Sequence, residues 1–468
     1  MLTHMSFNKD FLFGVATAAY QIEGAVDEDG RGRTIWDTFC DTPGKVARGE
    51  SGKVANDHYH YWKSDIAIMR ELGVNSYRFS MAWSRMFPNG RIADRNQKGF
   101  DFYNKLIDEL LLNGIKPLVT LYHWDLPQSL QDIGGWANRE IPFLFAEYAR
   151  EAAQSYGDRV EIFAPINEPW VHSWLGYGLG YHAPGIKDFA QAIAASHHTM
   201  LGHNLALQAI KSVNNKLKVG PVQSQSNADV DDIFDEKQIY AAKVFDMNQN
   251  TFWMDAFFKG EYPDLAYELY GERLTSVIKD GDLCKQQNDF LGINYYFNNR
   301  IGHEVEADHP NRVRVVDELT GLNMISTSNG KFTDMGWPIT PYGLEDLIVR
   351  WTKTYKDLPP VYVTENGAAY DDGISPDGKI HDQRRIEYLN NHLVAVLSAI
   401  KRGADVRGYM QWSMMDNFEW AVGYAKRFGI VHVDYETQKR TIKDSGFWYR
   451  DTIKALGSNL VEKFVDFA

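Results

Sequence analysis

The chain has little of what organises small secreted proteins or membrane proteins. It contains only two cysteines, Cys40 and Cys284, which excludes a disulfide framework or a cysteine-based zinc site as its organising device. Residues 1–8 lack a basic stretch followed by an apolar one, so they do not resemble a signal peptide. The apolar stretch 11–20 is too short to span a bilayer. We therefore expect a cytoplasmic protein without a membrane partner.

Positive charge is also scarce. Lys and Arg number 49 against 62 Asp and Glu, which gives a net charge of -13. Because affinity for phosphate backbones comes from Lys and Arg, this balance argues against nucleic acid as a partner. Linkers and internal repeats are missing as well, while 44% of the 468 residues are hydrophobic. We expect one domain over residues 1–468 with one large core, and a homo-oligomer is compatible with this composition.

Eight apolar stretches have the pattern of buried parallel strands, and helical patterns lie between them. The predicted strands are Phe11–Tyr20, Ser76–Met81, Lys116–His123, Glu161–Asn167, Leu217–Gln223, Asp289–Tyr296, Pro360–Glu365 and Val406–Trp412. Predicted helices include Tyr103–Asn113, Phe143–Tyr156 before Gly157, and Gln383–Arg402 before Gly403. This alternation predicts an α/β fold, a single (β/α)8 TIM barrel. A doubly wound open sheet is the second choice, because its glycine-rich nucleotide fingerprint is missing.

Polar or aromatic residues stand at the ends of seven of these strands, where barrel enzymes keep their chemistry. We expect them to converge on one site. They are Gln21 and Glu23, Arg78, His123 and Trp124, Asn167 and Glu168, Asn294 to Tyr296, Glu365, and Trp412.

Two of these strand ends carry glutamates, in Asn167-Glu168-Pro169 and in Thr364-Glu365-Asn366-Gly367. A pair of carboxyl groups is the minimum equipment for cleaving a glycosidic bond: one protonates the leaving oxygen and the other attacks the anomeric carbon. Taken singly, each motif also suits an ordinary turn. The segment 411–420 adds Trp412, Glu419 and Trp420, which suit the apolar faces and hydroxyl edges of a sugar.

Together these motifs resemble glycoside hydrolase family one, the retaining β-glucosidase type. The resemblance includes Tyr20-Gln21-Ile22-Glu23-Gly24 and Tyr122-His123-Trp124-Asp125, and extends from Phe11 to about Trp448. It implies hydrolysis of terminal β-D-glucosyl residues of cellobiose, short β-glucosides and aryl β-glucosides through a covalent glycosyl-enzyme intermediate. Activity on β-galactosides and β-fucosides, and transglycosylation, would accompany it. Phe163 and Pro165 depart from the family's usual Trp and Thr.

The resemblance also implies roles for individual residues. Glu168 would be the acid/base and Glu365 the nucleophile, held by Tyr296 with Asn294 beside it, and Arg78 would keep Glu365 ionised. The sugar's hydroxyls would be bound by Gln21, His123, Asn167, Glu419 and Trp420, over Trp412 as a stacking floor. Trp337 would line the aglycone entrance, and Phe428 would pack beside the sugar.

Several alternatives stay open at this point. A 6-phospho-β-glucosidase is disfavoured by Glu419, which would repel phosphate, although Lys426 and Arg427 lie near it in the sequence. A non-catalytic sugar-binding barrel would not need both glutamates, and a nicotinamide oxidoreductase would need a phosphate-binding glycine loop. His58, His60, His197, His198 and His203 lack a recognised metal spacing, so we expect neither metal nor cofactor.

Overall fold

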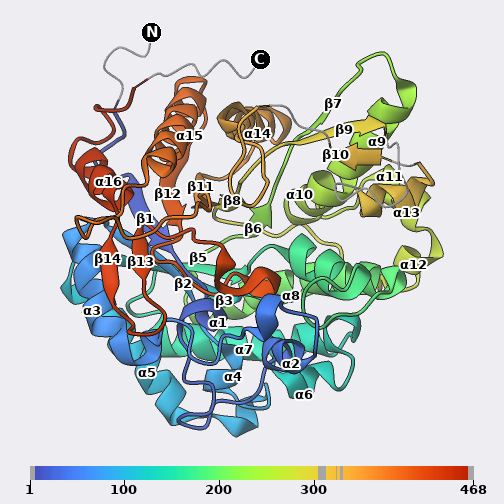
Figure 1. Cartoon of the computed structure of the whole chain (residues 1–468). Helices are drawn as coiled ribbons and strands as arrows, with labels where there is room; N and C mark the ends of the chain where they lie inside the picture. The colour runs from blue at the N-terminus through green and yellow to red at the C-terminus, as the bar shows by residue number, and fades with distance from the viewer. Residues whose placement is uncertain (1–5, 304–312, 323, 327–329, 462–468) are drawn as a thin grey trace.

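Nine parallel strands form a barrel at the centre of the molecule (Figure 1), and two short ones share the fifth of its eight strand positions. The computed structural model describes residues 6–303, 313–322, 324–326 and 330–461. The strands follow the order β5-β4-β3-β2-β1-β12-β11-β8-β6, and all of these pairings are parallel. Their bounds are β1 Leu12–Ala16, β2 Ser76–Ser80, β3 Lys116–Tyr122, β4 Ile162–Ile166, β5 Lys218–Val219, β6 Val222–Ser224, β8 Leu291–Asn294, β11 Val361–Asn366 and β12 Val406–Trp412.

Two short strands, β5 and β6, share the fifth strand position of the barrel. Together they connect the two edges of the sheet and so close the barrel. β5 pairs with β4 on one side, while β6, two residues further on, pairs with β8 on the other. A side chain on Gly220 would approach the Phe290 carbonyl oxygen to 2.2 Å, so the backbone passes too closely here for any other residue. The predicted continuous strand Leu217–Gln223 is therefore interrupted at Gly220 and Pro221.

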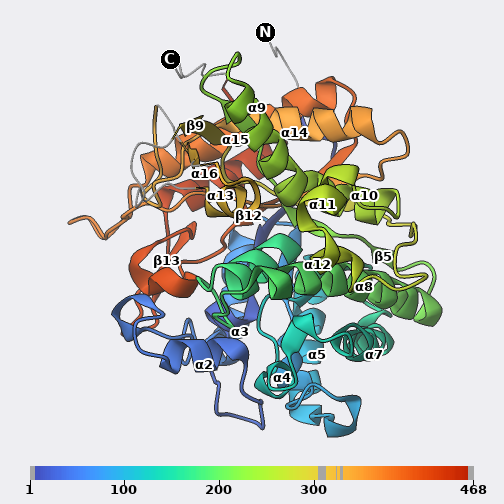
Figure 2. The ribbon, with the colours of Figure 1, turned by 90° about the vertical axis from the view of Figure 1, so that its right-hand side faces the viewer.

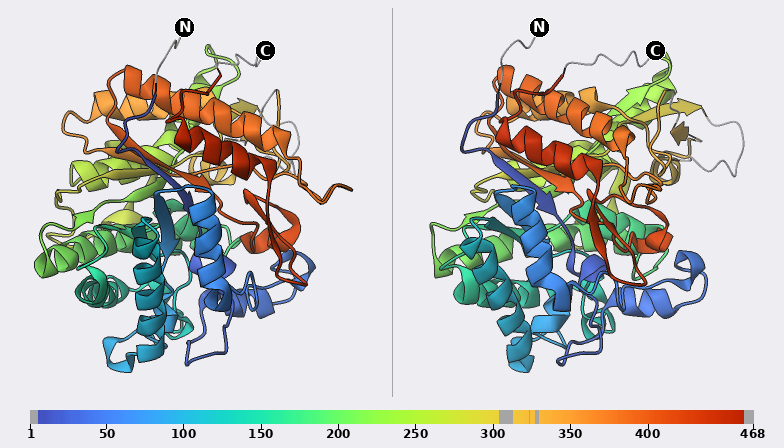
Figure 3. Two further views of the ribbon diagram at one scale, coloured as in Figure 1. Left: turned by 90° about the vertical axis from the view of Figure 1, so that its left-hand side faces the viewer. Right: turned by 60° about the vertical axis from the view of Figure 1, so that its left-hand side comes forward.

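Helices surround the barrel on its outside, as Figures 2 and 3 show. The longer helices are α3 His58–Glu71, α5 Gln97–Leu112, α7 Ile141–Tyr156, α8 Phe189–Val213, α9 Glu236–Asp246, α14 Pro341–Thr354, α15 Gln383–Lys401 and α16 Asp444–Lys454. Shorter helices are α1 Ala19–Ile22, α2 Ile35–Asp41, α4 Trp83–Met86, α6 Gln128–Gln131, α10 Phe252–Phe258, α11 Asp264–Tyr270, α12 Glu272–Thr275 and α13 Arg314–Thr320. Among the described residues, none of the helices combines the length and the apolar composition that spanning a bilayer requires.

Two small sheets extend the loops at the barrel's rim. β7 (Ala228–Val230), β9 (Asn299–His303) and β10 (Met324–Ser326) form one, and the hairpin of β13 (Val431–Val433) and β14 (Arg440–Ile442) forms the other. A π-helical segment, Val171–Gly178, follows the acidic end of β4, and a helical turn at Trp420–Ala425 follows the loop after β12.

Most of the other sequence-based boundaries differ from the structure by one or two residues, and the largest differences are at two places. The strand expected over Phe11–Tyr20 ends at Ala16, because the chain turns there and α1 begins at Ala19, whose amide donates to Ser80 Oγ at 2.7 Å. α5 begins at Gln97, before the expected Tyr103. The departure at Pro165 leaves the strand intact, since β4 pairs with β3 on both sides of it, at Ala164 and Ile166.

Candidate active site

A cavity of about 800 Å³ opens at the carboxyl ends of the barrel strands. Its floor brings together residues from β11, β12 and the ends of β3, β4 and β8. Most of the residues predicted from the sequence line it, namely His123, Glu168, Tyr296, Trp337, Glu365, Trp412, Glu419, Trp420 and Phe428. Gln21, Arg78, Asn167 and Asn294 lie in direct contact with these residues.

The two glutamates are buried in the same cavity but have different partners. Arg78 Nη1 donates to Glu365 Oε1 at 2.5 Å, and the Tyr296 hydroxyl donates to Glu365 Oε2 at 2.7 Å. Asn294 Nδ2 donates to Glu168 Oε1 at 2.7 Å. Glu365 therefore faces a cation and a hydroxyl donor, whereas Glu168 faces a neutral amide.

These environments separate the two carboxyl groups in acidity. Burial, and next the negative charge of Glu365, hold the pKa of Glu168 well above its usual value. Burial also raises the pKa of Glu365, but Arg78, Tyr296 and Asn294 oppose the rise. Arg78 thus limits the effect of burial on Glu365 without lowering its pKa below the ordinary range. Of the two groups, Glu168 therefore holds its proton more strongly, and Glu365 is the one that ionises more readily.

Amide side chains form a connected set around the glutamates. Asn167 Oδ1 accepts from Arg78 Nη2 at 2.6 Å and from Asn294 Nδ2 at 3.0 Å, and its Nδ2 lies 2.9 Å from His123 Nε2. Gln21 Nε2 donates to the Phe418 carbonyl at 2.8 Å and lies 3.4 Å from Glu419 Oε2. Gln21 Oε1 and His123 Nδ1 are buried without a protein partner, which suits them to bind a ligand.

Aromatic rings form the walls of the cavity. His123 stacks on both Trp412 and Trp420, with ring centroids 5.8 Å apart in each case. Trp337 packs against Tyr296 at 5.3 Å and against Phe428 at 5.9 Å. Apolar faces beside hydroxyl-binding groups are the surface that a sugar ring requires.

Three residues at the site have left-handed backbone conformations that non-glycine residues rarely adopt. They are Trp124, Glu168 and Trp420, with φ values of 74°, 46° and 48°. Such conformations cost free energy and persist where the surrounding structure enforces them, frequently at functional sites. The local strain therefore coincides with the cavity.

One predicted residue points elsewhere, and the sequence missed others. Glu23 is buried outside the cavity, where its carboxylate binds Arg85 and Tyr103. The cavity is also lined by residues of the segments that connect the barrel strands, which carried no recognisable signal, including Trp170, Leu175, His182, Gln225, Phe245, Asn248 and Met335. The shape of these connecting segments decides which residues meet at the cavity, and residue types alone do not reveal that shape.

The histidines that the sequence analysis rejected as metal ligands have hydrogen-bond partners within the protein. His58 contacts Asp65, His60 contacts Asp57, and His197 contacts Asp282. Across the ranges that the structure describes, no group of three or more His, Cys, Asp or Glu side chains has the arrangement of a metal site. Cys40 and Cys284 are both free thiols.

A closed barrel that places two buried glutamates of different acidity in an aromatic-walled cavity has the equipment of a glycoside hydrolase. Comparisons with known proteins agree with this class. The model of Glycosyl hydrolase family 1 matches residues 3–458. The chain belongs to this family, which confirms both the resemblance seen in the sequence and the (β/α)8 barrel.

Individual relatives are similar over nearly their whole length. The chain is 44% identical to the β-glucosidase A of Thermotoga maritima, over 96% of this chain and 98% of that protein. It is 42% identical to a bifunctional β-D-glucosidase/β-D-fucosidase of Bifidobacterium breve, over 95% and 98% of the two chains. A structure of the Thermotoga maritima family 1 β-glucosidase with isofagomine lactam superposes with a TM-score of 0.89 at 43% identity, over 97% and 99% of the chains.

Proposed function

We propose that this glycoside hydrolase is a retaining β-glucosidase, with Glu365 as the nucleophile and Glu168 as the general acid and base. The observation that carries the proposal is the contrast between two buried carboxyl groups in one cavity. Asn294 binds Glu168, while Arg78 and Tyr296 bind Glu365. The activities named for the relatives, β-glucosidase in Thermotoga maritima and Agrobacterium, support glucosides as the substrate class.

The proposed reaction has two displacements. Glu365 forms a bond to the anomeric carbon while the bond to the leaving oxygen breaks, and Glu168 gives its proton to that oxygen. Glu168, now ionised, then removes a proton from water, which attacks the anomeric carbon and releases Glu365. Two inversions leave the sugar in its original β configuration. An alcohol in place of water would give transglycosylation.

The polar residues around the glutamates would hold the non-reducing sugar. We assign its hydroxyls to Gln21, His123, Asn167, Glu419 and Trp420, with Trp412 beneath the ring and Phe428 beside it. The unpaired Gln21 Oε1 and His123 Nδ1 support this assignment. Trp337 would contact the aglycone. Acceptance of β-galactosides or β-fucosides would depend on Glu419, because we place the 4- and 6-hydroxyls against it.

A phosphorylated sugar fits the cavity less well. Burial, and next the charge of Glu365, raise the pKa of Glu419 to about 8, so added negative charge beside it would be unfavourable. The two cations near it in sequence are already engaged, Lys426 with the Asp334 carbonyl and Arg427 with Asp416. A 6-phospho-β-glucoside should therefore be cleaved more slowly than the plain glucoside.

Turnover of 4-nitrophenyl β-D-glucoside by the wild type beside Glu365→Ala tests the proposal. We expect the variant to lose about 10⁴-fold or more in kcat, because no other group can form the intermediate. Glu161→Ala is the control, since Glu161 lies exposed just before β4, at its amino end. Glu168→Ala should be least impaired on 2,4-dinitrophenyl β-D-glucoside, whose leaving group needs little protonation. No nitrophenol release from folded wild type would refute the assignment.

A further inference from the structure

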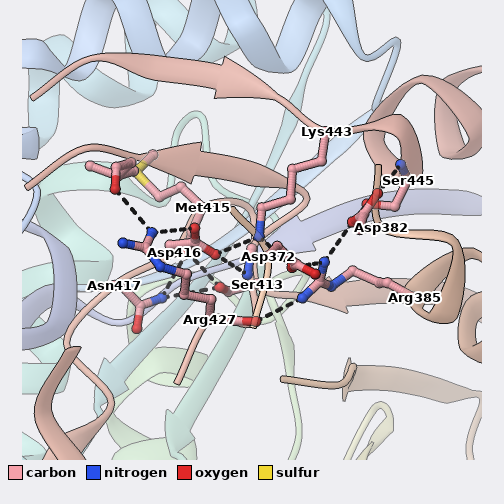
Figure 4. A network of polar contacts seen from close by, with 12 residues as sticks. Asp372, Asp382, Arg385, Ser413, Met415, Asp416, Asn417, Arg427, Lys443 and Ser445 are labelled. Carbon is pink, nitrogen blue, oxygen red and sulfur yellow. Dashed lines mark hydrogen bonds and ion pairs between the residues drawn. The ribbon is translucent and has the colours of Figure 1, made fainter. Parts of the chain in front are cut away.

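Figure 4 shows a buried network of charged side chains that the proposed reaction does not use. It consists of the carboxylates of Asp372, Asp382 and Asp416 and the cations of Arg385, Arg427 and Lys443. Within it, Asp382, Arg385, Asp416 and Lys443 are almost completely buried. Three negative and three positive charges balance, as buried charges require.

Asp416 is the member of this network that connects to the cavity. Its side chain is fully buried, and three donors point at it. Arg427 Nη1 donates to Oδ2 at 2.8 Å, while Lys443 Nζ and the Gly429 amide donate to Oδ1 at 2.9 Å and 3.0 Å. Burial opposes ionisation, but Lys443 and Arg427 hold the pKa of Asp416 below its usual value. The carboxylate is therefore a charged acceptor with its geometry fixed.

Asp416 joins the two chain segments that line one side of the sugar site. It lies three residues before Glu419 and within the loop 413–420 that follows β12. Its partners Arg427 and Gly429 flank Phe428 on the other segment. Backbone bonds link the same segments, since the Ser413 amide donates to the Phe428 carbonyl at 3.2 Å and the Asp416 amide to the Val431 carbonyl at 2.9 Å.

Asn417, the next residue in the chain, connects this loop to Gln21 at the sugar site. Asn417 Nδ2 donates to Ser413 Oγ and to the Met415 carbonyl, at 3.0 Å each. Its Oδ1 accepts from Gln21 Nε2 at 3.1 Å. The orientation of the Gln21 amide, and with it the unpaired Gln21 Oε1, thus depends on the loop that Asp416 holds.

We propose that Asp416 is a positioning residue for sugar recognition: it fixes the loop 413–420 against the segment 427–429, so that Glu419, Trp420 and Phe428 keep their places around the sugar. This inference rests on the proposed function. Its consequence is selective. A loosened loop should weaken recognition of the hydroxymethyl group that Glu419 would bind, more than recognition of the rest of the sugar ring.

The test compares Asp416→Asn with Asp382→Asn. Both changes remove one negative charge from the same buried network, but Asp382 binds Arg385 and Ser445 and, in the described part of the chain, has no hydrogen bond to the loop 413–420. It reaches the segment 427–429 only through Arg385, whose Nη2 donates to the Arg427 carbonyl at 2.7 Å. The substrates are 4-nitrophenyl β-D-glucoside and 4-nitrophenyl β-D-xyloside, which lacks the hydroxymethyl group. We expect Asp416→Asn to lower the ratio of kcat/KM for glucoside over xyloside about tenfold, the loss of roughly one charge-assisted hydrogen bond.

Inhibition constants give a second measurement that does not depend on xyloside turnover. In Asp416→Asn the constant for D-glucose should rise about tenfold and that for D-xylose little. Asp382→Asn should lower the melting temperature and leave both ratios at the wild-type value. If Asp416→Asn does not fold, Arg427→Met breaks one of the three Asp416 contacts at a side chain that is 21% exposed, and the same shift in ratio is expected.

Two outcomes overturn the inference. In the first, Asp416→Asn or Arg427→Met loses activity without a change in the ratios. In the second, Asp382→Asn changes the ratios as much as Asp416→Asn does, which would mean that the network has a general structural role. Both leave an active wild type. A wild type that neither hydrolyses a β-glucoside nor binds D-glucose would instead refute the proposed function, and the inference with it.

Discussion

Tyr296 is the residue through which the acidity of Glu365, the proposed nucleophile, can be examined without removing a charge. Its hydroxyl donates to Glu365 Oε2 at 2.7 Å and lowers the pKa of Glu365 against the effect of burial. Tyr296→Phe should therefore raise that pKa. The acid limb of the pH–activity profile should then move to higher pH by about half a unit to one unit. The pH profile of kcat/KM measures this shift, because it reports the free enzyme.

The alkaline side of the same profile is the internal control. Activity should be lost as pH rises through the elevated pKa of Glu168, whereas the Tyr296 hydroxyl donates its hydrogen bond to Glu365. Both limbs belong to an interacting pair, so a small movement of the alkaline limb is compatible with the assignment. An unmoved acid limb together with a displaced alkaline limb would reverse the roles of the two glutamates.

Glu419 should reduce the stability of the ligand-free protein. Its pKa in the folded state is raised to about 8, mainly by burial, whereas an unfolded chain would ionise it near its ordinary value. Between these values the folded state binds more protons, so the free energy of unfolding falls as pH rises. Glu419→Gln should remove this loss and stabilise the protein by roughly 1–3 kcal/mol at pH 7, while impairing sugar binding.

Denaturant unfolding at pH 5 and pH 7 measures the effect. The control is Glu140→Gln, at a surface carboxylate whose side chain is 48% exposed. That change should leave the pH dependence as in the wild type. A Glu419→Gln variant with wild-type pH dependence would show that Glu419 titrates normally in the folded protein.

Residue types predicted the centre of the site, but not what supports it. Glu168 and Glu365 could be found because each ends an apolar stretch, at the carboxyl end of a predicted barrel strand, where barrel enzymes keep their chemistry. Asp416 could not be assigned in this way. Its partners Arg427 and Lys443 lie 11 and 27 positions along the chain, and a charged residue in a sequence gives no indication that it is fully buried.

At the scale of elements, the contact between the loop 413–420 and the segment 427–431 depends on a glycine. A side chain at Gly429 would come within 2.1 Å of the Asp416 amide nitrogen, so Gly429→Ala must push the two segments apart. We expect a loss of about 1–3 kcal/mol in stability and a larger KM for glucosides. Thermal unfolding and steady-state kinetics measure the two effects.

Gly373 provides the matched control for this substitution. It lies exposed in the segment between β11 and α15, and a side chain there would have no heavy atom within 4 Å. Gly373→Ala should leave stability and KM near the wild-type values. Equal effects at the two glycines would mean that close packing at Gly429 has no special role.

Strand positions could be predicted well because a buried parallel strand is apolar on both faces. β12 has the expected bounds, Val406–Trp412. The first strand was extended too far because Ala19 and Tyr20 of α1 continue the apolar stretch of β1, and composition does not distinguish a short strand from a buried helical turn. The interruption between β5 and β6 at Gly220 follows from the close approach to Phe290, a residue distant in sequence.

For the whole molecule, the fold brings distant parts of the chain to one cavity. Gln21, near the start, contacts Asn417 and Phe418, which lie almost 400 residues further on. β1 also pairs directly with β12. A ligand that contacts residues from both ends of the chain should therefore stabilise the entire barrel against unfolding, and not only a single loop.

D-glucose, the proposed product, tests this expectation. At a hundred times its dissociation constant, a ligand that binds only the folded state adds about 2.7 kcal/mol to the free energy of unfolding. We expect one thermal transition that moves upward as a unit with D-glucose concentration. L-glucose at equal concentration is the control, because it has the same effect on the solvent but the wrong handedness for the site. An equal shift with both sugars would indicate a solvent effect, and two separate transitions would contradict a single cooperative domain over residues 1–468.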